Sequence, residues 1–272
     1  MFRHNPADEI RKLLSFAFDR HDFIAYNNKN KHKRGWRYKM KQHYLIAGLQ
    51  VEMESFGRTV TQAEPYRCEP FEIADIVIQS NWKDLQQRAP YLTEESCEYL
   101  STGSSFYRQL LNFEGLLLHS SAVMMDGKAY LFSAPCGTGK STHTQLWLKV
   151  FGDRARILND DKPALRLEDG VWYAYGTPWS GKYDYSVNAK VPLAGICMLS
   201  RGEKNKICPH GGAKAVHNIL EQTARSPDPG FMIQLLELLD KLVTMVPVWK
   251  LECNMDPEAA KVSYRAMSGK EE

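Results

Sequence analysis

The stretch from Ala134 to Thr142 contains the residue types that bind phosphate groups in proteins. It reads Ala-Pro-Cys-Gly-Thr-Gly-Lys-Ser-Thr, with two glycines directly before a lysine and two hydroxyls. Glycines let consecutive backbone N–H groups point at phosphate oxygens, a lysine supplies a mobile cation, and the next hydroxyl can bind Mg²⁺. The pattern predicts a phosphate-binding loop for a nucleoside triphosphate. The residues expected to contact the nucleotide are Cys136, Gly137, Thr138, Gly139, Lys140, Ser141 and Thr142.

The flanks of this loop have the required secondary structure. Residues 128–133 read as a strand, and residues 141–150 read as a helix that stops at Phe151-Gly152. The full signature G-x-x-x-x-G-K-[ST] begins with glycine, whereas this chain has Ala134 there. A chance glycine turn would need a strand before it and a helix after it by accident, so we prefer the phosphate loop.

A second group of polar residues ends the apolar stretch Arg156-Ile-Leu-Asn-Asp-Asp161, about twenty residues after Lys140. Phosphoryl transfer needs a ligand for the metal and a group that orients or deprotonates the attacking hydroxyl. Adjacent strand residues point to opposite faces, so Asp160 and Asp161 could divide these tasks. The alternative is a simple turn, because Asn-Asp-Asp also favours turns.

Two Asp-Gly pairs predict tight hairpins that bring distant residues together. The turn at residues 126–127 would join strand 116–125 to strand 128–133 and place His119 opposite Ala134, at the mouth of the loop. There His119 is either a packed ring or a group that bonds phosphate or tunes a nearby carboxylate. The turn at residues 169–170 would place Asp160 opposite Trp179, with residues 176–182 alongside the aspartates.

Composition excludes several classes of protein. The 272 residues, 43% of them hydrophobic, suffice for one main core and a small lobe, and no apolar run approaches the roughly 20 residues of a membrane span. The N-terminus lacks the apolar stretch of a signal peptide, which predicts a cytoplasmic protein without a membrane partner. Six scattered cysteines indicate reduced thiols rather than a disulfide frame or a zinc site.

The formal charge of +3 does not indicate a nucleic-acid partner, although much of the positive charge lies in residues 29–41. That segment is either a solvated linker or an arm for an acidic partner or RNA. It belongs to a predicted first region, 1–42, with a helix over residues 5–20. A strand-rich lobe over 43–115 follows, with strands near 44–53 and 71–78 and a short helix over 94–100, while 105–113 is a strand or a helix. The catalytic domain is expected over 116–272.

The ordered set of His119, Cys136-Gly-Thr-Gly-Lys-Ser-Thr142 and Leu158-Asn-Asp-Asp-Lys162 resembles the catalytic domain of HPr serine kinase/phosphorylase. It is more distantly similar to the ATP-dependent phosphoenolpyruvate carboxykinases. The resemblance implies a mixed α/β sheet, a P-loop nucleotide-binding domain, with ATP and Mg²⁺ bound. By the same resemblance Lys140 contacts the β- and γ-phosphates, Ser141 and Asp161 bind the metal, and Asp160 accepts the hydroxyl proton with His119 nearby.

The resemblance implies a kinase that transfers the ATP γ-phosphoryl group to a serine-like hydroxyl. The family's second glycine-bearing signature is not recognisable downstream of the aspartates, so HPr itself is not the expected acceptor. The expected acceptor is another protein, a peptide or a small molecule. A carboxykinase-like enzyme and a nucleotide-sensing module with little turnover are the alternatives. A homo-oligomer is possible. Arg201 is a cation that is either solvated or near the transferred group.

Overall fold

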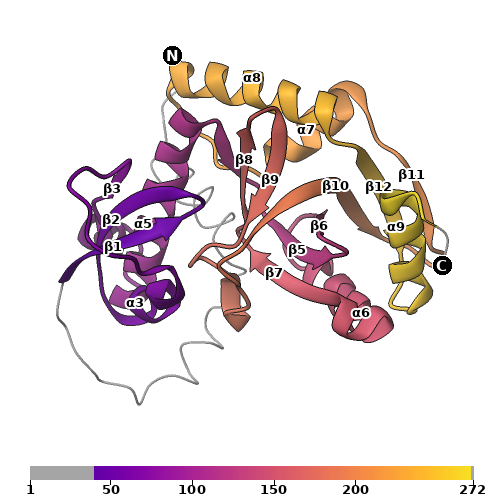
Figure 1. The fold of residues 1–272 in the computed structure, drawn as a ribbon, viewed down its shortest axis with the longest axis horizontal. Coiled ribbons are helices and arrows are strands. Elements are labelled where there is room, and N and C mark those ends of the chain that lie inside the picture. The colour runs from indigo at the N-terminus through magenta and orange to yellow at the C-terminus, as the bar shows by residue number, and fades with distance from the viewer. Residues whose placement is uncertain (1–39, 271–272) are drawn as a thin grey trace. The chain divides into compact units, whose positions relative to one another are not determined.

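The computed structural model describes residues 40–270, and the chain divides into two compact units between Phe106 and Tyr107 (Figure 1). The helix predicted over residues 5–20 and most of the basic segment 29–41 lie outside the described residues. The division falls inside a helix, whereas the sequence places a boundary after residue 115. Each unit is described separately below.

The first unit combines a three-stranded sheet with helices. Strands β1 (Met40–Ile46) and β2 (Leu49–Ser55) form an antiparallel hairpin, and β3 (Ile76–Ile78) pairs parallel with β2. The single strand expected near residues 44–53 is therefore wrong, because Ala47 and Gly48 turn the chain with φ values of 53° and 76°. Most of the predicted 71–78 strand lies outside β3.

More residues of this unit are helical than the predicted strand-rich lobe implies. Helix α5 runs on to the end of the unit and beyond, because apolar residues recur along it at helical spacing and no proline interrupts it. This also decides the ambiguous stretch 105–113, which is helical. The helical segments are α3 (Gly57–Ala63), η1 (Glu64–Tyr66), α4 (Trp82–Arg88) and α5 (Glu94–Leu110), and η2 (Leu111–Phe113) follows α5 in the second unit.

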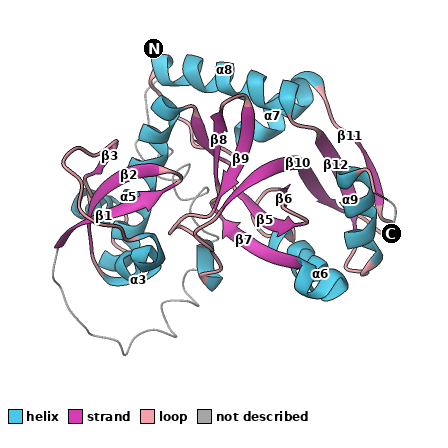
Figure 2. Cartoon of the chain, in the orientation of Figure 1, coloured by secondary structure: helices cyan, strands magenta, loops and turns pink. Residues whose placement is uncertain are grey.

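The second unit is built on a nine-stranded mixed sheet, shown in magenta in Figure 2. The strand order is β4-β8-β9-β10-β6-β5-β7, and β12 and then β11 extend the sheet from β10. The strands are β4 (Gly115–Leu117), β5 (Ser120–Met125), β6 (Lys128–Ser133), β7 (Ala155–Asp161), β8 (Ala164–Glu168), β9 (Val171–Tyr175), β10 (Lys190–Arg201), β11 (Lys206–Pro209) and β12 (Val248–Cys253). The mixed sheet expected from the sequence is confirmed.

Both predicted hairpins are present with the predicted register. Ser120 pairs with Ser133 in the first, and Ala164 pairs with Tyr175 in the second. The strand expected over residues 116–125 is interrupted, however, because β4 pairs with β8 while β5 lies between β6 and β7. Residues 118 and 119 cross between these two parts of the sheet.

Alternating side chains of β6 fill two cores on opposite faces of the sheet. Ala129 and Leu131 join the core that includes residues of α7 and α8, whereas Tyr130 and Phe132 join the core with α6 and α9. The helical segments of this unit are α6 (Lys140–Phe151), η3 (Gly152–Arg154), η4 (Gly181–Tyr183), α7 (Gly212–Glu221), α8 (Pro229–Met245) and α9 (Glu258–Ser268). Along the described part of the chain, no helix has both the length and the apolar content to span a membrane.

Candidate active site

The glycine loop, residues 134–139, connects the end of β6 to the start of α6. Gly137 and Gly139 have φ values of 74° and 123°, a region that residues with a side chain rarely adopt. The first N–H groups of α6 have no partner within the helix, and they add partial positive charge at the loop. Lys140 lies at this end, and its Nζ donates to the Ala134 carbonyl oxygen at 3.0 Å.

Arg201, the last residue of β10, holds the loop from its other side. Its Nη2 donates to the Gly137 carbonyl oxygen at 2.5 Å, and its Nε donates to the Thr138 carbonyl oxygen at 3.2 Å. These two bonds turn loop carbonyls toward a cation. Arg201 is thus neither simply solvated nor aimed at a transferred group, because its guanidinium braces the loop backbone.

Asp160, near the end of β7, faces the first turn of α6. β5 lies between β6 and β7, and its Ser121 is the register partner of Asp160. The Ser121 hydroxyl donates to Asp160 Oδ1 at 2.5 Å and is 2.8 Å from the Thr144 hydroxyl of α6. Ser141 also hydrogen-bonds the Asp160 carboxylate. The structure therefore brings the hydroxyl of the predicted loop to Asp160, with β5 as the connecting strand.

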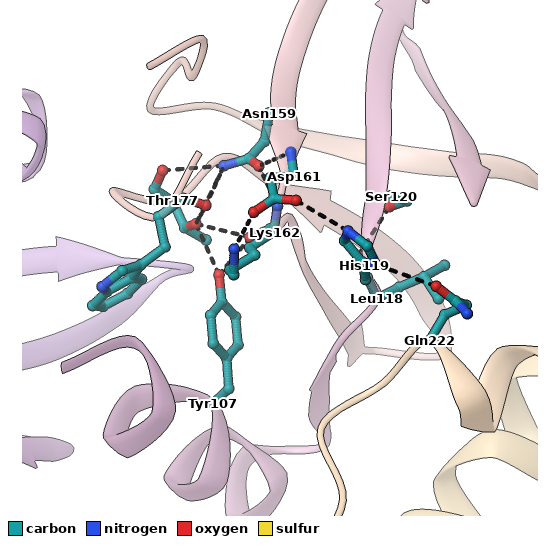
Figure 3. A network of polar contacts seen from close by, with 10 residues as sticks. Tyr107, Leu118, His119, Ser120, Asn159, Asp161, Lys162, Thr177 and Gln222 are labelled. Carbon is teal, nitrogen blue, oxygen red and sulfur yellow. Dashed lines mark hydrogen bonds and ion pairs between the residues drawn. The ribbon is translucent and has the colours of Figure 1, made fainter. Parts of the chain in front are cut away.

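Asp161 points elsewhere and belongs to a separate group of charges (Figure 3). Its Oδ1 lies 3.1 Å from His119 Nε2, and its Oδ2 forms an ion pair with the Lys162 ammonium. The other nitrogen of His119, Nδ1, lies 3.2 Å from Oε1 of Gln222, the residue that follows α7. The two aspartates point to different neighbours, as the strand alternation predicts.

Asn159 holds the backbone beneath the two aspartates (Figure 3). Its Oδ1 accepts from the N–H groups of Asp161 and Lys162 at 3.1 and 2.7 Å. Its Nδ2 donates to the Thr177 carbonyl oxygen at 3.1 Å and to the Ser186 hydroxyl at 3.2 Å. Thr177 and Tyr107 both donate to the Lys162 carbonyl oxygen. This network fixes residues 159–162 to the segment after β9.

That segment lies beside the aspartates, as the sequence predicts, but not in the predicted register. The ladder between β8 and β9 ends at Ala164 and Tyr175. Beyond it, the Asp160 N–H donates to the Tyr185 carbonyl oxygen at 3.0 Å, and the carbonyl of Trp179 accepts from Asn159 instead. The expected pairing of Asp160 with Trp179 is therefore wrong, because residues 176–184 leave the extended conformation, with Gly181 and Asp184 at φ values of 73° and 58°.

The pKa values of the two aspartate carboxyls are shifted in opposite directions. Burial raises the pKa of the Asp160 carboxyl to about 6, and the hydrogen bonds from Ser121 and Ser141 only partly offset this effect. Burial acts on Asp161 in the same direction, but Lys162 and His119 hold its pKa well below the usual range. Burial also lowers the pKa of both His119 and Lys140, against the opposing effect of Asp161. Asp161 therefore stays ionised, whereas Asp160 can exchange a proton near neutral pH.

The described residues contain no group of three or more histidine, cysteine, aspartate or glutamate side chains that could hold a metal by themselves. The Ser141 hydroxyl, next to the Asp160 carboxylate, instead suits a hard divalent cation that takes its remaining positions from phosphate oxygens and water.

The sequence singles out the loop, His119 and both aspartates, and the structure places them near one end of strands β5, β6 and β7. The sequence pattern did not single out Ser121, Lys162, Gln222 or the anchoring role of Asn159. Ser121 could have been found by extending the hairpin register to a third strand. Gln222 comes from more than 100 residues away and has no sequence signal. Cys136 is an exposed free thiol within the loop.

Comparison with known proteins connects this site to a named family. A family model described as "SynChlorMet cassette protein ScmC" matches residues 93–256, which is more than half of the chain. The chain belongs to this family. No curated protein matches. Among solved structures, the HPr(Ser) kinase/phosphatase from Coxiella burnetii matches 57% of this chain and 99% of its own, with 13% sequence identity and a TM-score of 0.33.

Proposed function

We propose that this ScmC-family chain is an Mg²⁺-dependent kinase that transfers the γ-phosphoryl group of ATP to a hydroxyl acceptor. The observation that carries the proposal is the contact of the Asp160 carboxylate with Ser141, in the first turn of the helix that follows a glycine loop. Phosphoryl transfer requires a proton acceptor beside the site where phosphates are held. In this chain a buried carboxylate lies at the N-terminus of a helix, where anions bind favourably.

The loop and its surroundings supply the nucleotide side of the proposed site. The N–H groups of residues 137–141 and the N-terminus of α6 would bind the phosphates, and Arg201 already holds two of the loop carbonyls away from them. Lys140 lies within reach of the loop and would exchange its bond to Ala134 for phosphate oxygens. We therefore expect the β- and γ-phosphates to lie between Lys140 and Ser141.

Asp160 supplies the acceptor side. In the proposed step the acceptor oxygen forms a bond to the γ-phosphorus, the bond from that phosphorus to the β–γ bridging oxygen breaks, and ADP leaves. The hydroxyl proton passes to Asp160, whose pKa is raised by burial. Asp161, held by Lys162 and His119, keeps a fixed negative charge beside this proton acceptor.

A divalent cation would neutralise charge on the β- and γ-phosphates, and Ser141 would contribute a ligand to it. The sequence assigns the metal to Ser141 and Asp161. In the structure both Asp161 oxygens contact cationic or hydrogen-bonding partners, and Asp160 is the carboxylate next to Ser141. We propose Ser141 as the protein hydroxyl on the metal, while Asp160 beside it remains the proton acceptor and is not a metal ligand.

The test is transfer of label from γ-labelled ATP to components of an extract of the source cell. Wild-type protein is compared with Lys140→Ala, Asp160→Asn and Lys149→Ala, the last a matched change of an exposed lysine at the far end of α6. We expect Asp160→Asn to lower transfer by about 10²- to 10⁴-fold, Lys140→Ala to abolish it and Lys149→Ala to leave it unchanged. Equal labelling by all four proteins refutes the proposal.

A second measurement separates the kinase from a nucleotide-sensing module. MgATP should raise the melting temperature of the wild type and not that of Lys140→Ala, because binding to the native state stabilises it by mass action. Stabilisation of the wild type without any labelled acceptor would favour the module.

A further inference from the structure

An aromatic surface lies on the outer flank of Asp160. It consists of Tyr183, Tyr185 and Val187, whose exposed fractions are 52%, 48% and 44%. The rings of Tyr183 and Tyr185 stack, with centroids 5.8 Å apart and planes inclined by 20°. Three half-exposed apolar side chains in five residues are unusual next to a candidate active site, and the site as described above does not use them.

The backbone ties this surface to Asp160. The Tyr185 carbonyl oxygen accepts from the Asp160 N–H at 3.0 Å, and the Val187 N–H donates to the Leu158 carbonyl oxygen at 3.0 Å. Asn159 and Ser186 form the antiparallel bridge between these two bonds. The surface therefore sits at a fixed register beside β7, and it cannot shift without breaking bonds made by the candidate base itself.

The register also fixes the direction of the side chains. Asn159 and Ser186 contact each other through their side chains at 3.2 Å, so both point to one side of the paired segments. Their neighbours Asp160 and Tyr185 then point to the opposite side, because successive residues of extended segments alternate. Ser121 is the register partner of Asp160 on the inner flank. Ser121, Asp160 and Tyr185 thus follow one another across three adjacent segments.

This order separates the two substrates. The glycine loop and Ser141 approach Asp160 from the flank of β5 and β6, while Tyr185 lies on the other flank. With the phosphates held at the loop, the side of Tyr185 is open to a hydroxyl that approaches Asp160, since Tyr185 is half-exposed. The tyrosines are therefore placed to contact the acceptor and not the phosphate chain.

We propose that Tyr183, Tyr185 and Val187 form the acceptor-docking surface, and that the acceptor is an extended peptide with an aromatic residue within about two positions of its serine or threonine. This inference rests on the proposed kinase function. Tyr185 and Val187 are alternate residues of an extended segment, and an extended peptide presents alternate side chains at the same spacing. Flat, half-exposed phenol rings favour stacking with a planar ring. A surface this open suits a chain laid across it better than a small molecule, which requires enclosure.

The experiment uses an array of synthetic peptides with one central serine, in which tyrosine, phenylalanine, tryptophan or alanine occupies each of the two positions on either side. Label transfer from γ-labelled MgATP is measured for the wild type, Tyr185→Ser, Tyr185→Phe and Tyr91→Ser. Tyr91, 59% exposed, lies in the other compact unit and serves as the matched control. We expect peptides with an aromatic neighbour to be labelled about tenfold faster than their alanine counterparts.

Tyr185→Ser should remove that preference, mainly through a higher KM for peptide, while Tyr185→Phe and Tyr91→Ser keep it. Stabilisation by MgATP should be the same in all four proteins, which also shows that the variants fold. A labelled array without aromatic preference, or a preference that survives in Tyr185→Ser, overturns the inference. It also falls if extract components other than peptides are labelled and no array peptide is, although the kinase proposal then stands. Absence of both MgATP stabilisation and labelling refutes the kinase proposal itself.

Discussion

Replacing Asn159 with alanine should cost the second unit a large part of its stability. Asn159 is fully buried, and its side chain accepts two backbone N–H bonds and has two protons to donate toward Thr177 and Ser186. At about 1 kcal/mol for each of about four buried hydrogen bonds, the free energy of unfolding should fall by about 4 kcal/mol. For a unit of this size the melting temperature should drop by about 12 °C.

Urea denaturation followed by circular dichroism measures this change, with Asn112→Ala as the control because Asn112 is exposed. The control should stay within about 0.5 kcal/mol of the wild type. Asn159→Asp keeps both accepted bonds but buries a carboxylate oxygen against the Thr177 carbonyl oxygen, so it should also be strongly destabilising. A loss below about 1 kcal/mol in Asn159→Ala would show that the network of Figure 3 does not hold the site together.

Three further changes test other parts of the site and of the unit around it. Gly181→Ala places a methyl group 2.8 Å from Asp161 Cβ at a φ of +73°, so it should lower the free energy of unfolding by about 1–3 kcal/mol in urea melts. Gly170→Ala is the control: it has open space around it, so it should show only the cost of an alanine at positive φ. Arg201→Ala should accelerate amide hydrogen exchange across residues 136–139 and leave α9 unchanged; equal protection in both proteins would contradict its bracing role. Asp126→Asn should remove a pH-dependent contribution to stability: the Tyr264 hydroxyl and Arg154 lower the pKa of Asp126 below its ordinary 3.8, so the wild type should exceed the variant by a constant amount above about pH 5, and this excess should shrink as the pH falls below 4. An excess that grows toward low pH would reverse the sign of this argument.

The sequence predicts those features whose causes are local. The glycine loop, both Asp-Gly hairpins and the strand that ends in two aspartates depend on residues within about ten positions of one another, so their patterns are visible directly. The register of the first hairpin follows from the two-residue turn at residues 126–127, and Ser120 accordingly pairs with Ser133. In the first unit, by contrast, the pattern did not show that Ala47 would turn the chain, because a non-glycine residue with positive φ has only a weak sequence signal.

The parts that could not be predicted depend on contacts between residues far apart in the chain. The break between β4 and β5 arises because the His119 N–H donates to the Gln222 carbonyl oxygen, more than 100 residues away, at 2.7 Å. The departure of residues 176–184 from the β9 ladder depends on Asn159, whose amide binds the carbonyls of Thr177 and Trp179. Neither contact leaves a periodic pattern in the sequence, and hydrophobic alternation alone would extend both strands.

Strand β5 lies between β6, which leads into the glycine loop, and β7, which ends at the aspartates. The geometry of the site therefore depends on strand register. Ser120 of β5 pairs with Ser133 on one side and with Asp161 on the other, so one residue sets the positions of both β6 and β7. A slip of one residue along either ladder would turn the Asp160 side chain to the opposite face, because side chains alternate along a strand. Asp160 would then lose Ser121 and Ser141 and approach the surroundings that now hold Asp161. The chemistry proposed for Asp160 therefore depends on the antiparallel pairing of β5 as much as on the identity of the carboxylate.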